Sequence, residues 1–398
     1  MAYTYPVKWI TSTMRGAPQI SGTAGTFIGA LDAFLLTGWG TATALSVSVS
    51  GGVGTAIFPD GTFFDDHAVV LFAGATTPAA LNGEARVLSH TNNSITFETN
   101  APDGVATTGT SITVKYAPVG GWSKPFQGAN LAVYKSTDVQ SPGHCLRVDD
   151  SGTTVARVLG YESMSDVATG VGPFPTTVMM SGGGYVHKSL AASTATVRYA
   201  MAGDGRAVLW AVEAGTYNST VNRVCNVRGF GDPIALAPGG DAWATFLSAN
   251  SSANNSSFDT GAVSGGSGSS TSGFTVSPRA FSAVGSAQYL NALPFTGSQS
   301  VVSGNDSFGG AAPSSVDGQV KLSKVFLKEQ VAGSPPRCIV PGVLYVPQSG
   351  LSTTVSPWDT LPAAGEWAGR RLLAVGTGSS PSNALSGIAF LDITGPWR

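Results

Sequence analysis

The sequence predicts an all-β protein: a small β-barrel followed by a larger β-sandwich, with one short helix near the N-terminus. Runs of alternating apolar and hydroxyl residues fill most of the chain, and Gly, Pro, Asn or Asp interrupts them roughly every 8–12 residues. Only one segment has a helical period. Only 11% of the 398 residues are charged, against roughly 25% in an ordinary soluble domain. Hydroxyl groups and the backbone of 52 glycines must therefore cover much of the surface.

The single helix is expected over residues 26–36, within an N-terminal segment that spans residues 1–44. Thr23 or Thr26 is the expected N-cap, and Gly38 is the expected stop. The apolar residues of this segment fall on one helical face, at i, i+1, i+4, i+7 and i+8: Phe27, Ile28, Leu31, Phe34 and Leu35.

Six β runs between residues 45 and 117 predict the small barrel. Turn sequences separate them, and Asn92-Asn93 indicates a tight hairpin because Asn tolerates the positive φ that such a turn needs. The expected strands are 45–49, 54–58, 68–73, 85–89, 94–98 and 111–116.

A segment rich in Pro, Gly and Trp at 118–128 is expected to link the barrel to the sandwich at 129–398. Hairpin turns are predicted at 149–152 and 203–206, the second with a solvated Arg206. Residues 249–273 are mostly Ser, Asn and Gly and predict a long loop. We expect the last β runs to complete this sandwich. The strands expected after 128 are 131–134, 145–148, 154–159, 196–201, 207–212, 221–227, 242–247, 318–327, 338–346, 371–376 and 387–393.

Charge and terminal composition exclude several function classes. The net charge is −2 with no run of like charges, so nucleic acid is not an expected partner. The first residues lack a basic stretch followed by an apolar one, so we expect no secretory signal and synthesis in a cytoplasm. Residues 33–59 are uncharged, but glycines and the alternation at 46–50 oppose a membrane-spanning helix.

The search for chemical motifs finds no catalytic pattern. Nucleotide-binding glycine spacings and the Gly-x-Ser-x-Gly elbow are absent from the sequence. Four histidines lie too far apart for a local metal motif, namely His67, His90, His144 and His187. Three cysteines at wide spacing predict buried free thiols, namely Cys145, Cys225 and Cys338. We therefore predict no enzymatic activity, no cofactor and no bound metal.

Two pairs of adjacent carboxylates leave an alternative open. Asp65-Asp66 and Asp149-Asp150 could bind a cation, or each could supply part of a glycosidase pair. Both pairs lie at predicted turns, where Asp caps its own backbone, and we favour that interpretation.

Aromatic residues in Gly-, Pro- and Ser-rich segments are the candidate contact residues. Such side chains often contact sugars or neighbouring subunits, although they can also fill the ends of a sandwich. The candidates are Trp39, Trp122, Tyr185, Tyr217, Trp358, Trp367 and Trp397. Trp397 lies between Pro396 and Arg398, which suits docking into a neighbour; packing on its own sandwich is the alternative. The 249–273 loop is the other candidate for contact between subunits.

A distinctive set of segments is spread along the chain: Tyr5-Pro6-Val7-Lys8-Trp9, Gly16-Ala17-Pro18, Gly25-Thr26-Phe27, Pro78 to Glu84, Trp122 to Phe126, Leu146 to Asp150, Ser181 to Tyr185, Gly203 to Arg206 and Asp392 to Trp397. Together they resemble structural virion proteins of tailed bacteriophages that are associated with the tail or baseplate. The likeness covers nearly the whole chain, and none of its segments carries a catalytic role.

The resemblance implies a non-enzymatic structural component of a virion, with host attachment as one role. The expected partners are other virion proteins, copies of the chain itself, and a glycan or protein of the host surface. Low charge agrees with a homo-oligomer, because few like charges keep copies apart. The alternatives are a capsid-associated decoration or spike protein, and a carbohydrate-active enzyme that uses scattered carboxylates.

Overall fold

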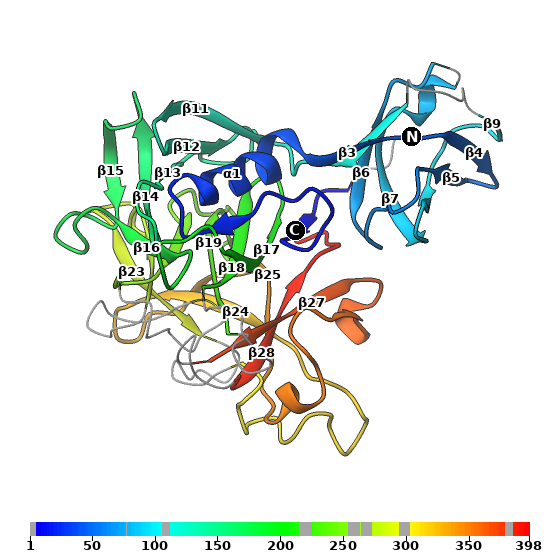
Figure 1. Cartoon of the computed structure of the whole chain (residues 1–398). Helices are drawn as coiled ribbons and strands as arrows, with labels where there is room; N and C mark the ends of the chain where they lie inside the picture. The colour runs from blue at the N-terminus through cyan, green and yellow to red at the C-terminus, as the bar shows by residue number, and fades with distance from the viewer. Residues whose placement is uncertain are drawn as a thin grey trace.

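The computed structural model describes residues 5–76, 78–105, 112–214, 224–253, 263, 273–293, 303–378 and 385–398. Strands account for 45% of the chain and helices for 6%, so the predicted all-β class is confirmed. The strands form sheets of 14, eight and six strands (Figure 1). Among the described residues, no helix is both long and apolar enough to cross a membrane.

The predicted helix is confirmed, but its cap is not. Helix α1 (Thr26–Asp32) continues into a π-helical turn, η1 (Ala33–Thr37), and ends at Gly38. Gly25 occupies the cap position with φ 82° and supplies no side chain. A carboxylate from another part of the chain caps the helix instead, and no local sequence pattern could indicate it.

The strands predicted for the barrel all form, together with two more, in one eight-stranded sheet. Its order is β3-β10-β6-β7-β8-β5-β4-β9, so β3 and β9 are its edges and no closed barrel is found among the described residues. The strands are β3 (Trp39–Thr43), β4 (Ser46–Ser50), β5 (Val53–Ile57), β6 (Val69–Ala73), β7 (Gly83–His90), β8 (Ser94–Glu98), β9 (Gly104–Val105) and β10 (Thr113–Tyr116).

The expected linker at 118–128 contains a strand over residues 122–128. Strand β11 (Trp122–Gly128) forms an edge of the six-stranded sheet, and Pro125 lies at a register shift of its pairing with β12. An edge strand tolerates proline there because no ladder hydrogen bond is lost. The other strands are β12 (Leu131–Ser136), β13 (Cys145–Asp149), β14 (Val155–Met164), β15 (Gly170–Phe174) and β16 (Gly184–His187).

The 14-stranded sheet joins both ends of the chain. Strand β1 (Lys8–Thr11) pairs with β17. The C-terminal strands continue this sheet after β23, and they are not part of the six-stranded sheet that contains residue 131. Its other members are β2 (Ile20–Ser21), β17 (Thr196–Gly203), β18 (Ala207–Glu213), β19 (Asn226–Gly231), β20 (Ile234–Ala235), β21 (Phe246–Ala249), β22 (Phe274–Ser277), β23 (Gln288–Leu293), β24 (Ser323–Glu329), β25 (Pro336–Tyr345), β26 (Thr360–Pro362), β27 (Arg371–Thr377) and β28 (Gly387–Asp392).

One continuous buried cluster includes residues of all three sheets. The ring of Phe230 in β19 lies 6.4 Å from Trp122 and 6.3 Å from Phe174, between centroids, and so joins the 14- and six-stranded sheets. Phe27 of α1 packs edge-on against Trp210 at 5.8 Å. The helix thus lies between the two sheets, near β12 and β18 (Figure 1).

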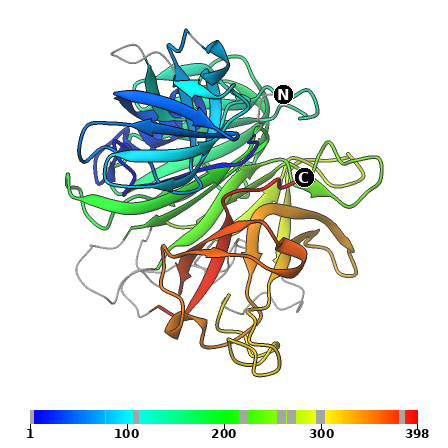
Figure 2. The ribbon, with the colours of Figure 1, turned by 90° about the vertical axis from the view of Figure 1, so that its right-hand side faces the viewer.

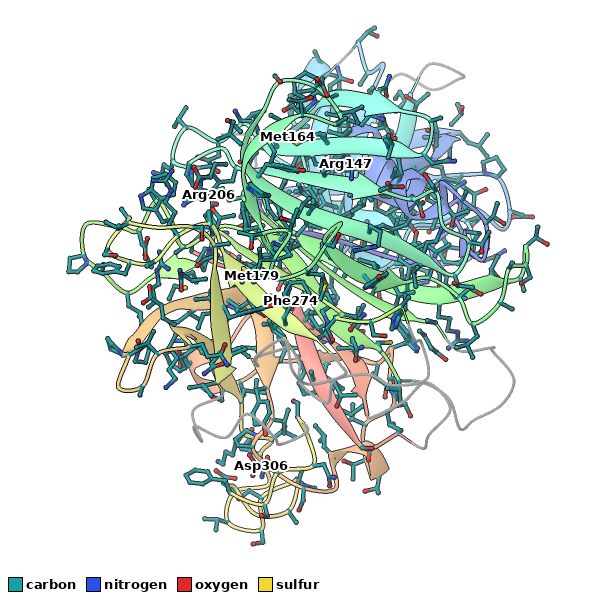
Figure 3. All side chains as sticks on the ribbon, turned by 90° about the vertical axis from the view of Figure 1, so that its left-hand side faces the viewer. Arg147, Met164, Met179, Arg206, Phe274 and Asp306 are labelled. Carbon is teal, nitrogen blue, oxygen red and sulfur yellow. The ribbon has the colours of Figure 1, made fainter. Side chains whose placement is uncertain are left out.

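The eight-stranded sheet, blue to cyan, and the orange to red C-terminal strands lie at opposite ends of the view in Figure 2. From the other side, Met164 of the six-stranded sheet and Asp306 also lie far apart (Figure 3). The predicted 249–273 loop lies mostly outside the described residues. The three cysteines are free and buried, as predicted.

Candidate functional site

A polar hollow of about 290 Å³ lies where the N-terminal strand, the eight-stranded sheet and the C-terminal strands meet. We call it the junction hollow. Strands β1, β7, β17, β26 and β27 contribute to it, together with the loop between β5 and β6. Its lining residues are Trp9, Thr11, Ser12, Thr13, Asp65, Asp66, His90, Arg198, Trp358, Thr360 and Leu373.

Contacts between distant segments create the junction. Lys8 of β1 forms an ion pair with Glu84 of β7 at 2.8 Å, and its ammonium also donates to the carbonyl of Val119 at 2.9 Å. Arg86 of β7 donates to the carbonyl of Thr394 at 3.1 Å. Because both chain ends are attached to β7, the hollow exists only in the folded molecule.

Asp65 is oriented by a tyrosine from the neighbouring sheet strand β10. The Tyr116 hydroxyl donates a short hydrogen bond to Oδ2 of Asp65. Burial and the adjacent carboxylate raise the pKa of Tyr116 far above its usual range, so the phenol stays a donor. Oδ1 of Asp65 has no hydrogen-bond partner among the described residues.

Asp66 is paired with a histidine. Oδ1 of Asp66 lies 2.7 Å from Nδ1 of His90, and the imidazole stacks on Phe63 with 4.9 Å between ring centroids. This contact leaves Oδ2 of Asp66 and Nε2 of His90 open. The predicted turn is present, since Ala68 N–H bonds to the carbonyl of Asp65, but both carboxylates contact distant side chains rather than capping their own backbone.

Aromatic and aliphatic side chains form the rest of the wall. Trp9 is buried, and Trp358 is partly buried at φ 78°. The hydroxyls of Thr11 and Thr13 bond to each other at 2.9 Å. Within the described residues, no group of three or more His, Cys, Asp or Glu side chains could hold a metal ion. The hollow thus offers both hydrogen-bond donors and hydrogen-bond acceptors beside apolar rings.

The structure brings one of the predicted contact aromatics, Trp358, to the junction hollow. Trp39 and Trp122 are buried elsewhere: Trp39 stacks on Tyr116 at 5.0 Å, and Nε1 of Trp122 donates to the carbonyl of Asp204 at 2.8 Å. Little of these two rings is available to a partner.

The remaining candidates are spread over the molecule. Tyr185 lies under the guanidinium of Arg157 at 3.9 Å. Trp367, on a short 3₁₀ turn, lines a wide groove of about 610 Å³ at the C-terminal end of the molecule. Tyr217 lies outside the described residues. Whether any of these rings contacts a partner stays a prediction.

The C-terminal residues dock on their own chain. Trp397 is only 6% exposed, and its Nε1 donates to the carbonyl of Asp392 at 3.0 Å. Arg398 donates to Asp204 at 2.9 Å and to the carbonyl of Asp232 at 3.0 Å. Trp397 therefore packs against a sheet of its own chain, which was the alternative to docking into a neighbour.

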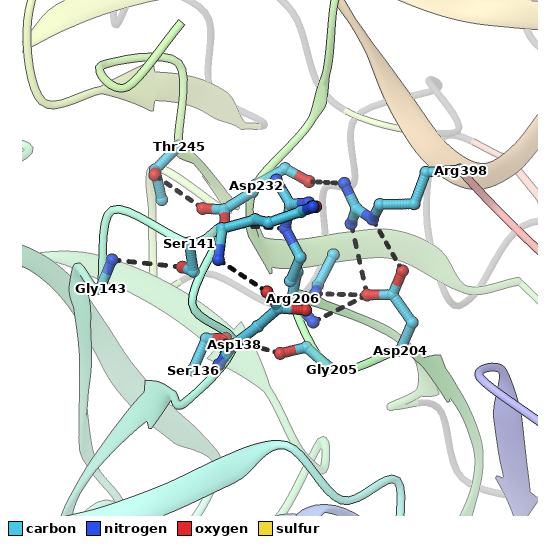
Figure 4. Close-up of polar contacts among 12 residues, drawn as sticks. Ser136, Asp138, Ser141, Gly143, Asp204, Gly205, Arg206, Asp232, Thr245 and Arg398 are labelled. Atoms are coloured by element: carbon cyan, nitrogen blue, oxygen red, sulfur yellow. Dashed lines mark hydrogen bonds and ion pairs between the residues drawn. The ribbon is translucent and has the colours of Figure 1, made fainter. Parts of the chain in front are cut away.

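The 203–206 hairpin is confirmed, but its arginine is not solvated. The Arg206 side chain is 19% exposed and donates to Gln140 at 3.0 Å, with Asp232 at 3.5 Å. Figure 4 shows Arg206 beside Asp232, Arg398 and Asp204. The prediction failed because the partners come from segments far away in the sequence.

A buried His-Thr-Asp chain borders this cluster. Thr245 donates to Asp232 at 3.0 Å and therefore accepts the hydrogen bond from Nδ1 of His144 at 2.8 Å. A histidine that donates to a hydroxyl cannot remove its proton, so this arrangement is not a nucleophile and base. His144 is buried and hydrogen-bonded, as its prediction as a structural histidine required.

The carboxylate that caps α1 is Asp150, which the sequence had placed in an ordinary turn. Its Oδ2 accepts from the N–H groups of Phe27 at 2.8 Å and Ile28 at 3.2 Å, and its Oδ1 pairs with Lys188. Both charged side chains are fully buried. Only Asp149 behaves as predicted, by accepting from the N–H of Ser151 at 3.2 Å.

Comparison of this chain with protein-family models and with curated protein sequences gives no match.

Proposed function

We propose that this chain is a non-enzymatic structural component of a bacteriophage virion, in the tail or baseplate, with host attachment as its outward-facing role. Its expected partners are copies of itself and other virion proteins. The segments that resemble tail-associated virion proteins motivate the proposal, and the distribution of charge over the folded molecule supports it.

The observation that carries the proposal is the low number of charged residues, 44 of 398. Among the described residues, ion pairs within the chain engage 11 Lys and Arg residues and 12 Asp and Glu residues. The centres of protein interfaces are depleted of charge, because charged groups lose more on desolvation than hydroxyls do. A surface with so few charges suits a molecule that associates over broad areas.

The outer face of strands β4, β5 and β8 illustrates such a surface. Ser48, Thr55 and Thr96 lie opposite one another in the strand pairing and point away from the core. Exposed aliphatic side chains flank them, including Ile57 at 41% exposure and Leu45 at 54%. In this proposal residues 45–117 form an open, barrel-like unit and residues 129–398 a β-sandwich.

Localisation on the particle tests the proposal. Gold-labelled antibodies against the purified chain are applied to intact particles of the phage that encodes it. Label at the tail or baseplate is the expected result. Label on the capsid would favour the alternative of a decoration or spike protein, and particles that lack the chain would overturn the virion role.

A further inference from the structure

Three polar atoms around the junction hollow are left without partners by the contacts that orient their side chains. They are Oδ1 of Asp65, Oδ2 of Asp66 and Nε2 of His90. Asp66 and His90 are exposed, and Oδ1 of the half-buried Asp65 is not among the buried unpaired atoms of the described residues, so these atoms can reach a ligand. We propose that the junction hollow binds a neutral saccharide.

The polar side of the hollow matches a polyhydroxyl ligand. Sugar hydroxyls donate to carboxylate oxygens, and a guanidinium such as that of Arg198 donates to sugar oxygens. Hydrogen bonds with Tyr116 and His90 already orient the two carboxylates. Side chains that are already oriented lose little conformational entropy when a ligand binds.

The apolar side of the hollow matches the C–H face of a sugar ring. Trp9, Trp358 and Leu373 supply this wall. Ligand pockets usually combine apolar and aromatic walls with a few convergent polar groups. A volume of about 290 Å³ is close to the lower end of such pockets, roughly 300 Å³. We therefore expect a short saccharide or the end of a longer glycan.

Charge selects a neutral ligand. Asp65 and Asp66 both line the hollow and repel a sulfate or a sugar carboxylate, and Arg198 is the single Lys or Arg among the lining residues. A metal ion is disfavoured, because no group of three or more suitable side chains gathers in the described part of the chain.

The saccharide site deepens the host-attachment part of the proposed function, and its biological role rests on that proposal. The binding reaction itself does not depend on the particle. It is therefore tested on the isolated full-length chain, and its failure is separate from a failure of virion localisation.

The experiment screens the chain on an array of neutral, uronic acid-containing and sulfated oligosaccharides. The retained oligosaccharide is then titrated by calorimetry. We expect retention of neutral oligosaccharides only. The variants Asp66→Asn, His90→Gln and Trp358→Ala should each weaken binding at least tenfold, whereas Asp317→Asn, which lies outside the hollow, should bind as the unmodified chain does.

Thermal unfolding of each variant separates loss of binding from loss of structure. Because Asp66 and His90 lie at the surface, their variants test the site even if Trp358→Ala does not fold. The proposal is overturned if the unmodified chain retains no neutral oligosaccharide, if acidic ones are preferred, or if Asp66→Asn and His90→Gln bind normally. Cleavage of the retained oligosaccharide would support the ligand class and contradict the non-enzymatic part of the proposed function.

Discussion

At the residue scale, burial changes what a side chain contributes to stability. His187 is 3% exposed, and its Nε2 lies 2.9 Å from the carbonyl of Ser252. Desolvation lowers the pKa of His187 to about 4. Between about pH 6.5 and pH 4, His187 is therefore protonated in the unfolded chain but neutral in the folded chain.

We expect the free energy of unfolding to fall as the pH falls through this window. The contribution of His187 is about 3 kcal/mol at most, because its pKa falls from 6.5 to about 4 on folding. Urea unfolding at pH 7, 5 and 4 measures it, and His187→Gln should have the shallower dependence. His90→Gln, whose imidazole is 34% exposed, is the control. An unchanged dependence in His187→Gln would contradict this account.

A second residue-scale prediction concerns Gly342, where the backbone meets the Trp397 indole. Gly342 has φ 71°, and an added Cβ would overlap the indole ring. Gly333 has φ 77° with open space around it, so it is a matched control. Gly333→Ala should lose only the backbone cost of about 1 kcal/mol, and Gly342→Ala about 1–3 kcal/mol more. Equal midpoints in urea would show that Trp397 does not pack there.

At the element scale, a buried ion pair holds α1 between two sheets. The helix spans seven residues, too few to be stable alone, and no side chain of its own segment caps it. Asp150 supplies the cap from the end of β13, and Lys188 balances its charge after β16. Tyr134 of β12 bonds to Asp32 at the other end of α1, at 2.8 Å.

Asp150→Asn should destabilise the protein by about 3–5 kcal/mol, because Lys188 would remain buried and charged without its partner. Asp149→Asn, one residue away in the exposed turn, should cost less than about 1 kcal/mol. Chemical denaturation of the two variants side by side measures the difference. Similar losses would argue against the buried pair, and recovery in Asp150→Asn with Lys188→Met would support it.

At the scale of the whole molecule, we expect the low content of charged residues to determine how copies of the chain associate. Only 11% of the residues are charged, so contacts between copies must rest mainly on hydroxyl and apolar groups. Ionic screening weakens exposed charge pairs but not such contacts. The eight-stranded sheet and the C-terminal strands lie at opposite ends of the view in Figure 2, so the molecule offers several faces for such contacts.

We therefore expect the chain to remain in purified particles that are washed in 1 M NaCl, where the Debye length is about 3 Å. Sedimentation of the washed particles, followed by detection of the chain in pellet and supernatant, measures this. A wash in dilute urea controls for release by any perturbation. Release by salt alone would mean that ion pairs hold the chain in the particle.

Local patterns in the sequence determined many of the strands, the hairpin turns and the helix. The alternation of Val47 and Val49 with serines predicts a strand with one buried face, and β4 has that burial pattern. Gly203 to Arg206 predicts a hairpin, and β17 and β18 pair around it. Such features depend on residues a few positions apart, so they can be read without a fold.

The tertiary structure alone decided which sheets the strands joined, which aspartate was buried and where the junction hollow lies. Asp65 and Trp358 line one hollow although 293 positions separate them, and no periodicity or turn chemistry relates them. Asp149 and Asp150 are neighbours in the same predicted turn, yet one reaches solvent and the other is fully buried against Lys188. Strand pairing and desolvation act between distant segments, so the sequence pattern around each residue carries no record of them.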